Sequence, residues 1–350
     1  MRSTPATKHF RLSQGFTLVE LMIALVLGLI VVGGSMALFV SQRVTHQQSG
    51  DMSNIQNEGR IALDALVRDL RGAGDFGCTV NNNNRIINTV SLFDPANGGI
   101  FGFKDTAAMG RTAPVPPPPS TPITPSADFP LRGSQTVASF NPKGSVLATV
   151  GIYGMISALN APANGTVNSL VLTGSPAVQP GDVLVVSDCV SASIFEASKV
   201  ATALGVTTVQ HNASVNTGGM GNGNNAPGLG ANYPRGATVG RLDVIWWFYA
   251  ENITVDGQQL SGLFRMSARD NTPLLVSNRV TSLAVNYTLP NGTVQNTLNA
   301  AGETWASPTS ANLTVTVRSD KRSKAVKGSL GDFDTIPLQT SVGLRNRVVN

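Results

Sequence analysis

The N-terminal part of the chain contains one uninterrupted apolar stretch. Between Phe16 and Val40 the only ionisable side chain is that of Glu20. The 25 residues from 16 to 40 would rise about 37 Å as an α-helix, and the hydrocarbon core of a bilayer is about 30 Å thick. The stretch is therefore predicted to be a helix that can span a membrane.

Beyond Val40 the pattern becomes amphipathic, which predicts that the helix continues with one buried stripe. Glycines at 72, 74 and 77 are expected to end it, so that it runs from about Phe16 to about Arg71, about 84 Å in all. Asp64 and Arg68 are spaced to form a favourable pair on its surface. The expected stripe comprises Ile55, Gly59, Ala62, Leu63, Leu66, Val67 and Leu70, and the charged residues expected on other faces are Glu58, Arg60, Asp64, Arg68, Asp69 and Arg71.

The rest of the chain predicts short strands joined by long loops. Asp256-Gly257 and Pro290-Asn291-Gly292 are typical of hairpin turns between such strands. The predicted fold class is therefore α+β, with a long N-terminal helix packed on a β-rich globular head of antiparallel sheets. The β-branched and aromatic runs that predict strands are residues 145–153, 169–173, 183–187, 237–250, 260–266, 280–288 and 311–317.

Two segments of the head are predicted to be loops from their composition. Residues 113–130 are proline-rich and are expected to form an exposed polyproline II stretch, either a rigid surface loop or a segment that binds a partner. Residues 216–236 are rich in Gly and Asn and are expected to form a mobile surface loop. Residues 216–236 weakly resemble a calcium β-roll repeat, but they lack the tandem copies that such a site needs. They also match a relaxed dinucleotide fingerprint, but without the strand before it and the helix after it.

Composition favours an exported, β-rich protein without a nucleic-acid surface. Of the 350 residues, 41% are apolar and 13% are charged, with 36 Gly and 20 Pro. The net charge of +5 depends on Arg2, Lys8 and Arg11, because the other 22 basic residues face 20 acidic ones. Basic residues before an apolar helix predict a cytoplasmic N-terminus and a translocated head.

The two cysteines, Cys78 and Cys189, are predicted to form a disulfide bond. Neither has the close Cys/His spacing of a zinc site, so no metal site is expected. In an oxidising compartment a bridge that closes this long loop would stabilise the fold by about 4 to 5 kcal/mol. The alternative is two separate buried thiols.

An ordinary secretory signal is a competing interpretation of the N-terminus. Ser35-Met36-Ala37 has the small residues of a cleavage site, but the apolar run is longer than the usual signal core and contains Glu20. A carboxylate in lipid costs a few kcal/mol unless it is paired, which makes Glu20 a candidate functional residue. Its alternative role is that of a side chain near a helix end that reaches water.

The motif Gly15-Phe16-Thr17-Leu18-Val19-Glu20, after a short basic leader and before an apolar helix, resembles the class III signal of type IV pilins and pseudopilins. The resemblance implies cleavage after Gly15 by a prepilin peptidase and N-methylation of Phe16. It also implies that Glu20 pairs with the N-terminal amine of a neighbouring subunit. The chain then divides into a leader (1–15), a membrane and spine helix (16–72) and a periplasmic head (73–350).

The stretch from Glu58 to Gly74, followed by Gly77-Cys78, is similar to minor pilins of the PilW type. This narrower resemblance implies a structural subunit in pilus initiation and the tip complex, with roles in twitching motility and adhesion. Its implied partners are other minor and major pilins, the prepilin peptidase, the inner-membrane assembly platform and a tip adhesin, and its implied location is the inner membrane and then the pilus at the cell surface. The alternatives are a type II secretion pseudopilin of the J type and a DNA-uptake pilin.

No enzyme activity or cofactor is expected from the sequence. His9, His46 and His211 are widely spaced, and no nucleophile or phosphate-binding motif occurs. The local basic run of Arg318, Lys321, Arg322, Lys324 and Lys327 is expected to be a solvated loop before the last strand, although in a DNA-uptake pilin it would contact phosphates.

Overall fold

The computed structural model describes residues 17–77, 86–90, 99–104, 142–212, 228–270, 272–296, 308–322 and 333–344. The chain divides into two compact units, Met1–Asn54 and Ile55–Asn350. The proline-rich segment 113–130 and the leader lie outside the described residues.

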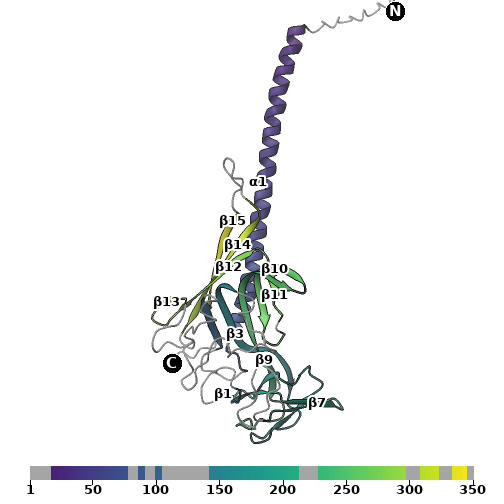
Figure 1. Ribbon diagram of the computed structural model, residues 1–350, viewed down its shortest axis with the longest axis vertical. Coiled ribbons are helices and arrows are strands. Elements are labelled where there is room, and N and C mark those ends of the chain that lie inside the picture. The colour runs from purple at the N-terminus through teal and green to yellow at the C-terminus, as the bar shows by residue number, and fades with distance from the viewer. Residues whose placement is uncertain are drawn as a thin grey trace, which may run out of the picture. The chain divides into compact units, whose positions relative to one another are not determined.

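The long helix α1 runs from Leu18 to Gly72 and comprises 55 residues (Figure 1). It ends as expected at glycines, because Gly74 and Gly77 have left-handed backbone conformations, with φ of 75° and 99°. The residues after the helix form backbone hydrogen bonds with β3 (Lys143–Ala158). The Gly74 N–H donates to the Val150 carbonyl at 2.8 Å, and the Ile152 N–H donates to the Asp75 carbonyl at 2.9 Å.

An eight-stranded sheet forms the centre of the head. Its order is β1-β6-β5-β9-β10-β11, with β3 also paired to β9 and β2 paired to β3. All these pairs are antiparallel except β1 with β6. The other strands are β1 (Ile86–Asn88), β2 (Ile100–Lys104), β5 (Val183–Ser187), β6 (Ala192–Glu196), β9 (Thr238–Val255), β10 (Gln258–Ser267) and β11 (Leu274–Ser277).

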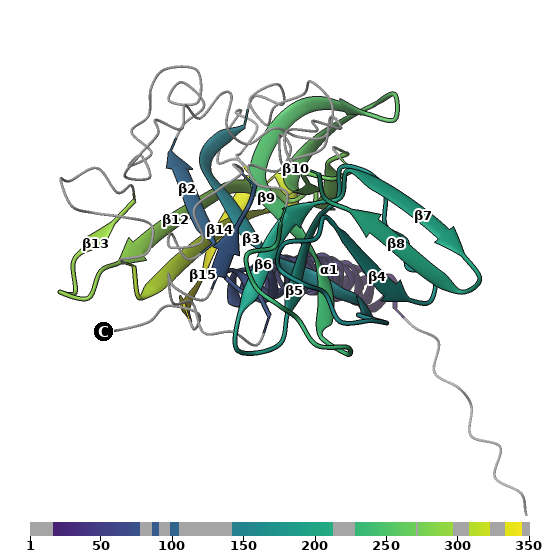
Figure 2. The same ribbon diagram turned by 90° about the horizontal axis from the view of Figure 1, so that it is seen from below.

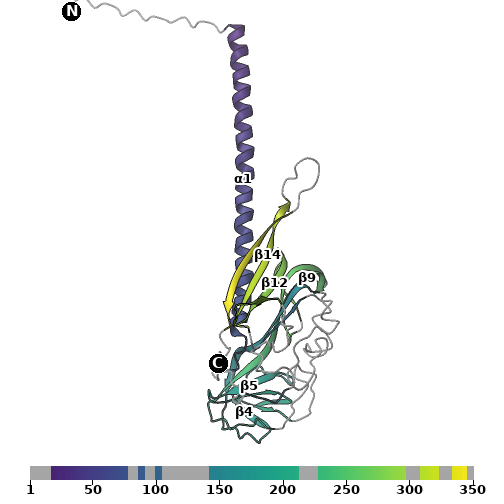
Figure 3. The ribbon, with the colours of Figure 1, turned by 90° about the vertical axis from the view of Figure 1, so that its left-hand side faces the viewer.

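Two smaller antiparallel sheets lie at opposite ends of the head (Figure 3). One has the order β13-β12-β14-β15, with β12 at Val280–Thr288, β13 at Val294–Gln295, β14 at Ser310–Arg322 and β15 at Phe333–Gly343. The other has the order β4-β8-β7, with β4 at Ser169–Thr173, β7 at Lys199–Ala203 and β8 at Val206–Gln210. Figure 2 shows the latter sheet at one side of the head.

The head contains two apolar cores. The larger one joins the C-terminal part of α1 to the central sheet and to the β12–β15 sheet, and its fully buried side chains include Leu66 and Trp247. The smaller one lies under the β4-β8-β7 sheet and includes Leu172, Phe195 and Tyr233. The predicted stripe of α1 is confirmed, because Ile55, Ala62, Leu63, Leu66 and Leu70 are buried and Gly59 faces Leu338 and Val317.

Several predicted strands have the expected bounds, and the others are longer than expected. β4, β5 and β12 are matched residue for residue, whereas β3, β9, β10 and β14 extend beyond the predicted ranges. The Asp256-Gly257 turn is confirmed: both residues have left-handed φ, 49° and 78°, and they join β9 to β10. The Asn291-Gly292 turn joins β12 to β13.

Part of the predicted mobile loop 216–236 is in fact packed core. Residues 216–227 lie outside the described residues, but Leu229 and Tyr233 are fully buried in the smaller core. The Gly230 N–H donates to the Gly165 carbonyl at 3.1 Å, and the Tyr233 hydroxyl lies 2.6 Å from Ser193 Oγ. The expectation of a mobile loop was wrong here because two large side chains in a Gly- and Asn-rich segment are enough to anchor it.

Candidate functional site

Helix α1 begins with a capping residue. The backbone N–H of Glu20 donates to Thr17 Oγ1 at 3.2 Å, and the N–H of Leu21 donates to the Thr17 carbonyl at 3.1 Å. Threonine followed by glutamate three residues later is the spacing of a capping box. The cap fixes the start of the helix and places Glu20 in its first turn, where a carboxylate interacts favourably with the helix dipole.

The Glu20 carboxylate lies at the start of an apolar helical segment. Leu18–Arg43 is long and apolar enough to cross a membrane, by length and composition, and none of its residues is buried. Among the residues that the structure describes, none donates a hydrogen bond to this carboxylate. Gly15 and Phe16 lie outside those residues, so cleavage and methylation stay predictions.

A second carboxylate of α1, that of Asp69, is buried against the central sheet. Its Oδ2 accepts hydrogen bonds from Trp247 Nε1 at 2.8 Å and from Arg265 Nε at 2.7 Å. Arg265 Nη2 also donates to Asp69 Oδ1 at 3.3 Å. The Asp69 side chain is 8% exposed and that of Arg265 is 30% exposed. This ion pair joins the helix to β9 and β10, and we call Asp69, Trp247 and Arg265 the helix anchor.

Tyr153 covers one side of the helix anchor. The Arg265 guanidinium lies 6.0 Å from the centre of the Tyr153 ring, and the Tyr153 hydroxyl lies 2.6 Å from Thr149 Oγ1. Burial and the nearby Asp69 charge raise the pKa of Tyr153. Burial opposes the charge of Arg265, yet its hydrogen bond with Asp69 leaves the pKa of the guanidinium above its ordinary value. Within the helix anchor, the Asp69 carboxylate and the Arg265 guanidinium therefore neutralise each other.

Glu58 makes a second polar contact between α1 and the head. Its Oε2 accepts a hydrogen bond from Ser277 Oγ at 2.7 Å, and its Oε1 lies 3.7 Å from Arg279 Nε. Glu58 and Asp69 thus attach the helix at two points, one near β11 and one at β9 and β10.

The sequence-based placement of Asp69 on a face other than the buried stripe was wrong. Glu58 lies outside the stripe, as expected, and its side chain is 35% exposed. Asp69 falls in the buried stripe itself, which recurs at four- and three-residue steps through residues 55, 59, 62, 66, 69 and 73. This spacing was a usable signal, because an acid within an apolar stripe requires a buried donor. Its partners, Trp247 and Arg265, come from distant strands and have no local signal. Asp64 and Arg68 are exposed, as expected.

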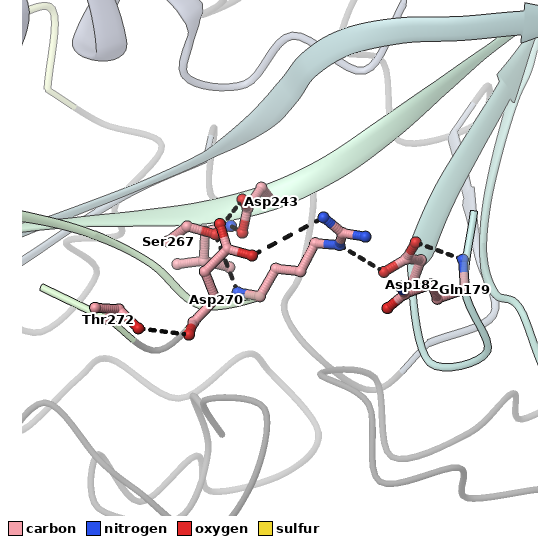
Figure 4. Close-up of polar contacts among 8 residues, drawn as sticks. Gln179, Asp182, Asp243, Ser267, Asp270 and Thr272 are labelled. Carbon is pink, nitrogen blue, oxygen red and sulfur yellow. Dashed lines mark hydrogen bonds and ion pairs between the residues drawn. The ribbon is translucent and has the colours of Figure 1, made fainter. Parts of the chain in front are cut away.

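A second buried acid, Asp243 on β9, lies in a polar cluster with Ser267 and Asp270 (Figure 4). Its Oδ2 accepts from Ser267 Oγ at 2.5 Å, and its Oδ1 accepts from the Val244 N–H at 2.8 Å. Burial raises the pKa of Asp243 to about 6, although both hydrogen bonds work in the opposite direction. This carboxyl is therefore close to neutral at mildly acidic pH.

An ion pair between Arg269 and Asp182 closes the same cluster. Arg269 Nε donates to Asp182 Oδ1 at 2.9 Å, and Asp182 Oδ2 accepts from the Gln179 N–H at 2.9 Å (Figure 4). The hydrogen bond with Asp182 raises the pKa of Arg269. Within the described ranges, no three His, Cys, Asp or Glu side chains are grouped so as to hold a metal ion.

The other predicted site residues are scattered. Cys189 has a left-handed φ of 68°. Cys78 lies outside the described residues, so a disulfide between the two cysteines stays a prediction. His46 is exposed on α1 and His211 is buried beside Phe195. The basic run does not begin in a loop as expected, because Arg318, Lys321 and Arg322 belong to β14; Lys324 and Lys327 are outside the described residues.

An apolar helix of membrane-spanning length that carries one carboxylate and continues into a β-rich head is the layout of a pilin-like protein. The family model of the prokaryotic N-terminal methylation motif matches residues 10–36. This motif is a type IV prepilin-like signal, and it indicates a type IV pilin-like or pseudopilin protein. No curated protein and no solved structure was found to match the chain.

Proposed function

We propose that the protein is a minor pilin of the PilW type, a non-catalytic subunit that joins other minor pilins in an initiating or tip complex of a type IV pilus. The methylation motif and the layout of helix and head support this role. In the proposal, a prepilin peptidase cuts after Gly15 and methylates Phe16. The processed chain stays in the inner membrane, with its head in the periplasm, until it enters the filament.

The observation that carries the proposal is the position of Glu20. It is a carboxylate at the start of an apolar segment, and no described residue of its own chain donates to it. A carboxylate transferred to lipid is costly unless an opposite charge accompanies it. Cleavage after Gly15 would create an ammonium group at Phe16. In the proposal, the ammonium of a neighbouring subunit pairs with Glu20, so that assembly neutralises both charges.

The proposal is tested in a bacterium that supplies the prepilin peptidase and the filament machinery. The membrane-extracted chain is expected to have lost residues 1–15 and gained one methyl group by intact mass. Glu20→Gln is expected to be processed normally but to be depleted from sheared filaments about tenfold, since an unpaired ammonium in lipid costs at least about 1.4 kcal/mol. Asp64→Asn, at an exposed site on the same helix, is the matched control.

An uncut chain, or equal incorporation of Glu20→Gln and the parent, would overturn the proposal. Purifying the filament also separates the alternatives: recovery with type II secretion pseudopilins rather than with pilins identifies a J-type role. DNA uptake is tested by the retardation of DNA by the full chain at rising salt, with and without Arg318→Gln, because Arg318 is exposed on β14.

A further inference from the structure

Strand β7 is an open edge of the β4-β8-β7 sheet. It pairs with β8 on one side and has no second neighbour among the strands that the structure describes. Lys199, Ala201, Thr202 and Ala203 are exposed, whereas Val200 is partly buried and packs against the smaller core. Between Lys199 and His211 the hairpin of β7 and β8 has no charged residue. Such an edge is a template for pairing with another strand.

Several other sheet edges of the head are short, contain proline or are covered. β1 and β13 are three and two residues long, and β11 is a four-residue strand that follows Pro273. β15 is long but contains Pro337, which has no N–H to donate. The outer side of β4 is covered by the end of β3, where the Asn160 N–H donates to the Val171 carbonyl at 2.8 Å. β7 has only Lys199, at its first residue.

The turn of the β7–β8 hairpin contains a residue that local folding does not explain. Leu204 and Gly205 form its two-residue turn with φ of 52° and 74°. Left-handed φ costs a leucine about 1 kcal/mol, and the equivalent turn between β9 and β10 uses Asp256, a residue suited to this conformation. The Leu204 side chain is also fully exposed, at 103%. Neither the backbone nor solvation in the isolated chain favours leucine here.

The hydrogen-bonding pattern of β7 fixes which groups are available. In a hairpin with a two-residue turn, the pair that closes the turn exchanges both of its hydrogen bonds. That pair is Ala203 with Val206, so Ala203 and Ala201 direct their backbone groups towards β8. Val200 and Thr202 therefore direct their backbone N–H and C=O groups outwards, to the open edge.

We propose that β7 pairs with β7 of a second copy of this chain, antiparallel and centred on Thr202. This register places Thr202 opposite Thr202 and Ala201 opposite Ala203, and it brings the turn residue Leu204 next to Val200 of the other copy. Threonine pairs and apolar pairs are favourable cross-strand neighbours, and no two lysines face each other. The exposed Leu204 side chain thereby gains an apolar partner. The outcome is one continuous sheet through two heads, β4-β8-β7-β7-β8-β4.

The size of this contact predicts where it forms. A pair of five-residue strands buries much less than the roughly 1,200 Å² of a stable soluble complex. The contact is therefore weak between free molecules. Two copies held in the same bilayer have a high effective concentration, which converts a weak contact into a populated one. The inference does not depend on the proposed role in a pilus.

Cysteine cross-linking of the full chain in lipid vesicles tests the register. In the proposed pair the two Thr202 Cα atoms lie about 5.5 Å apart, within disulfide range, whereas the two Ala201 Cα atoms lie beyond about 7 Å. Thr202→Cys is expected to give about tenfold more oxidised dimer than Ala201→Cys, because only the former pair can be bridged without backbone movement. Val294→Cys, exposed on another sheet, reports random collision.

Energy transfer between labelled chains gives a second measurement that introduces no new cysteine. Thr202→Lys places two ammonium groups opposite each other at an exposed site and is expected to abolish the transfer seen for the parent. Thr173→Lys, exposed on β4 of the same sheet, is expected to leave it unchanged. Equal cross-linking of Thr202→Cys and Ala201→Cys, or unchanged transfer for Thr202→Lys, overturns the proposal. The proposal is also overturned if, in whole cells, Thr202→Cys forms an adduct only with a different polypeptide.

Discussion

The two carboxylates Glu20 and Asp69 lie near opposite ends of one helix and differ in their hydrogen-bond partners and burial. Asp69 accepts three hydrogen bonds from Trp247 and Arg265 and is almost fully buried. Glu20 receives none among the described residues, although it sits at the start of the most apolar segment. An acid with its partner in the same chain contributes to folding. In the proposed function, an acid without one, such as Glu20, is paired by a neighbouring subunit.

The apolar residues of α1 show the same contrast. Leu25 and Ile30 are 59% and 65% exposed, whereas Leu66 and Leu70 are 0% and 1% exposed. The head supplies the surface that buries the second pair, at roughly 25 cal/mol per Å² of apolar area. Among the described residues none covers the first pair, and in the proposed function lipid or another subunit covers it. In the proposed function the helix is thus a folding element in one half and an assembly element in the other.

Removing the partnered acid is expected to have the largest effect on the head. Asp69→Ala leaves the buried Trp247 Nε1 and the partly buried Arg265 guanidinium without this acceptor, which should lower the free energy of unfolding by about 3 kcal/mol. Asp64→Ala, at an exposed site of the same helix, should change it by less than about 0.5 kcal/mol. Urea unfolding of the full chain in detergent, followed by tryptophan fluorescence, measures both.

Glu20→Gln extends this comparison, because it should leave the unfolding of the head unchanged. If Asp69→Ala and Asp64→Ala unfold at the same urea concentration, the helix anchor contributes no stability and the contrast between the two carboxylates fails.

Asp243 is a third kind of acid, buried with hydrogen-bond donors but without a direct ion pair among the described contacts. Its pKa in the folded head, about 6, is higher than in an unfolded chain, so the folded state binds more protons between about pH 4 and 6. Its contribution is fully present below the unfolded pKa and is lost as pH rises through 6. The free energy of unfolding should therefore fall by about 2 kcal/mol from pH 4 to pH 7 through this group.

The measurement is the urea midpoint across this pH range for the parent and for Asp243→Asn, which keeps an acceptor for the Val244 N–H. Asp243→Asn should lose this part of the pH dependence and be the more stable of the two at pH 7. A parallel pH profile for both chains would show that Asp243 ionises in the folded head as it does in the unfolded chain.

The sequence predicts the features that have local signals. The length of α1, its buried stripe and its glycine end follow from periodicity, and β4, β5 and β12 follow from short β-branched runs. The turn at Asp256-Gly257 follows from the need for left-handed φ at both positions. The turn at Leu204-Gly205 was missed, because leucine is an unusual residue for that conformation and gives no turn signal.

The polar contacts of the head could not be predicted, because their partners are remote in sequence. Arg265 is separated from Asp69 by 196 residues and Ser277 from Glu58 by 219. Which arginine meets which acid depends on the register of β9 with β10, including the irregularity between Leu260 and Gly262. Periodicity indicates that a side chain faces inwards, but it does not identify the partner. Glu20 was identifiable because its signal is entirely local.

Two glycines of α1, Gly59 and Gly50, sharpen the comparison of the two halves at smaller scale. A Cβ at Gly59 would overlap the side chain of Leu338 and crowd Val317, whereas a Cβ at Gly50 meets nothing within 4 Å. Gly59→Leu should therefore lower the free energy of unfolding of the head by about 1 to 3 kcal/mol, through overpacking between the helix and β15.

Gly50→Leu is the matched control: it makes the same chemical change and should leave head unfolding unaltered, while favouring the helix locally by up to about 1 kcal/mol. The same urea titration, with circular dichroism for helix content, measures both. Equal effects at the two positions would mean that leucine acts through helix propensity alone, and that the close approach of the helix to β15 contributes nothing to stability.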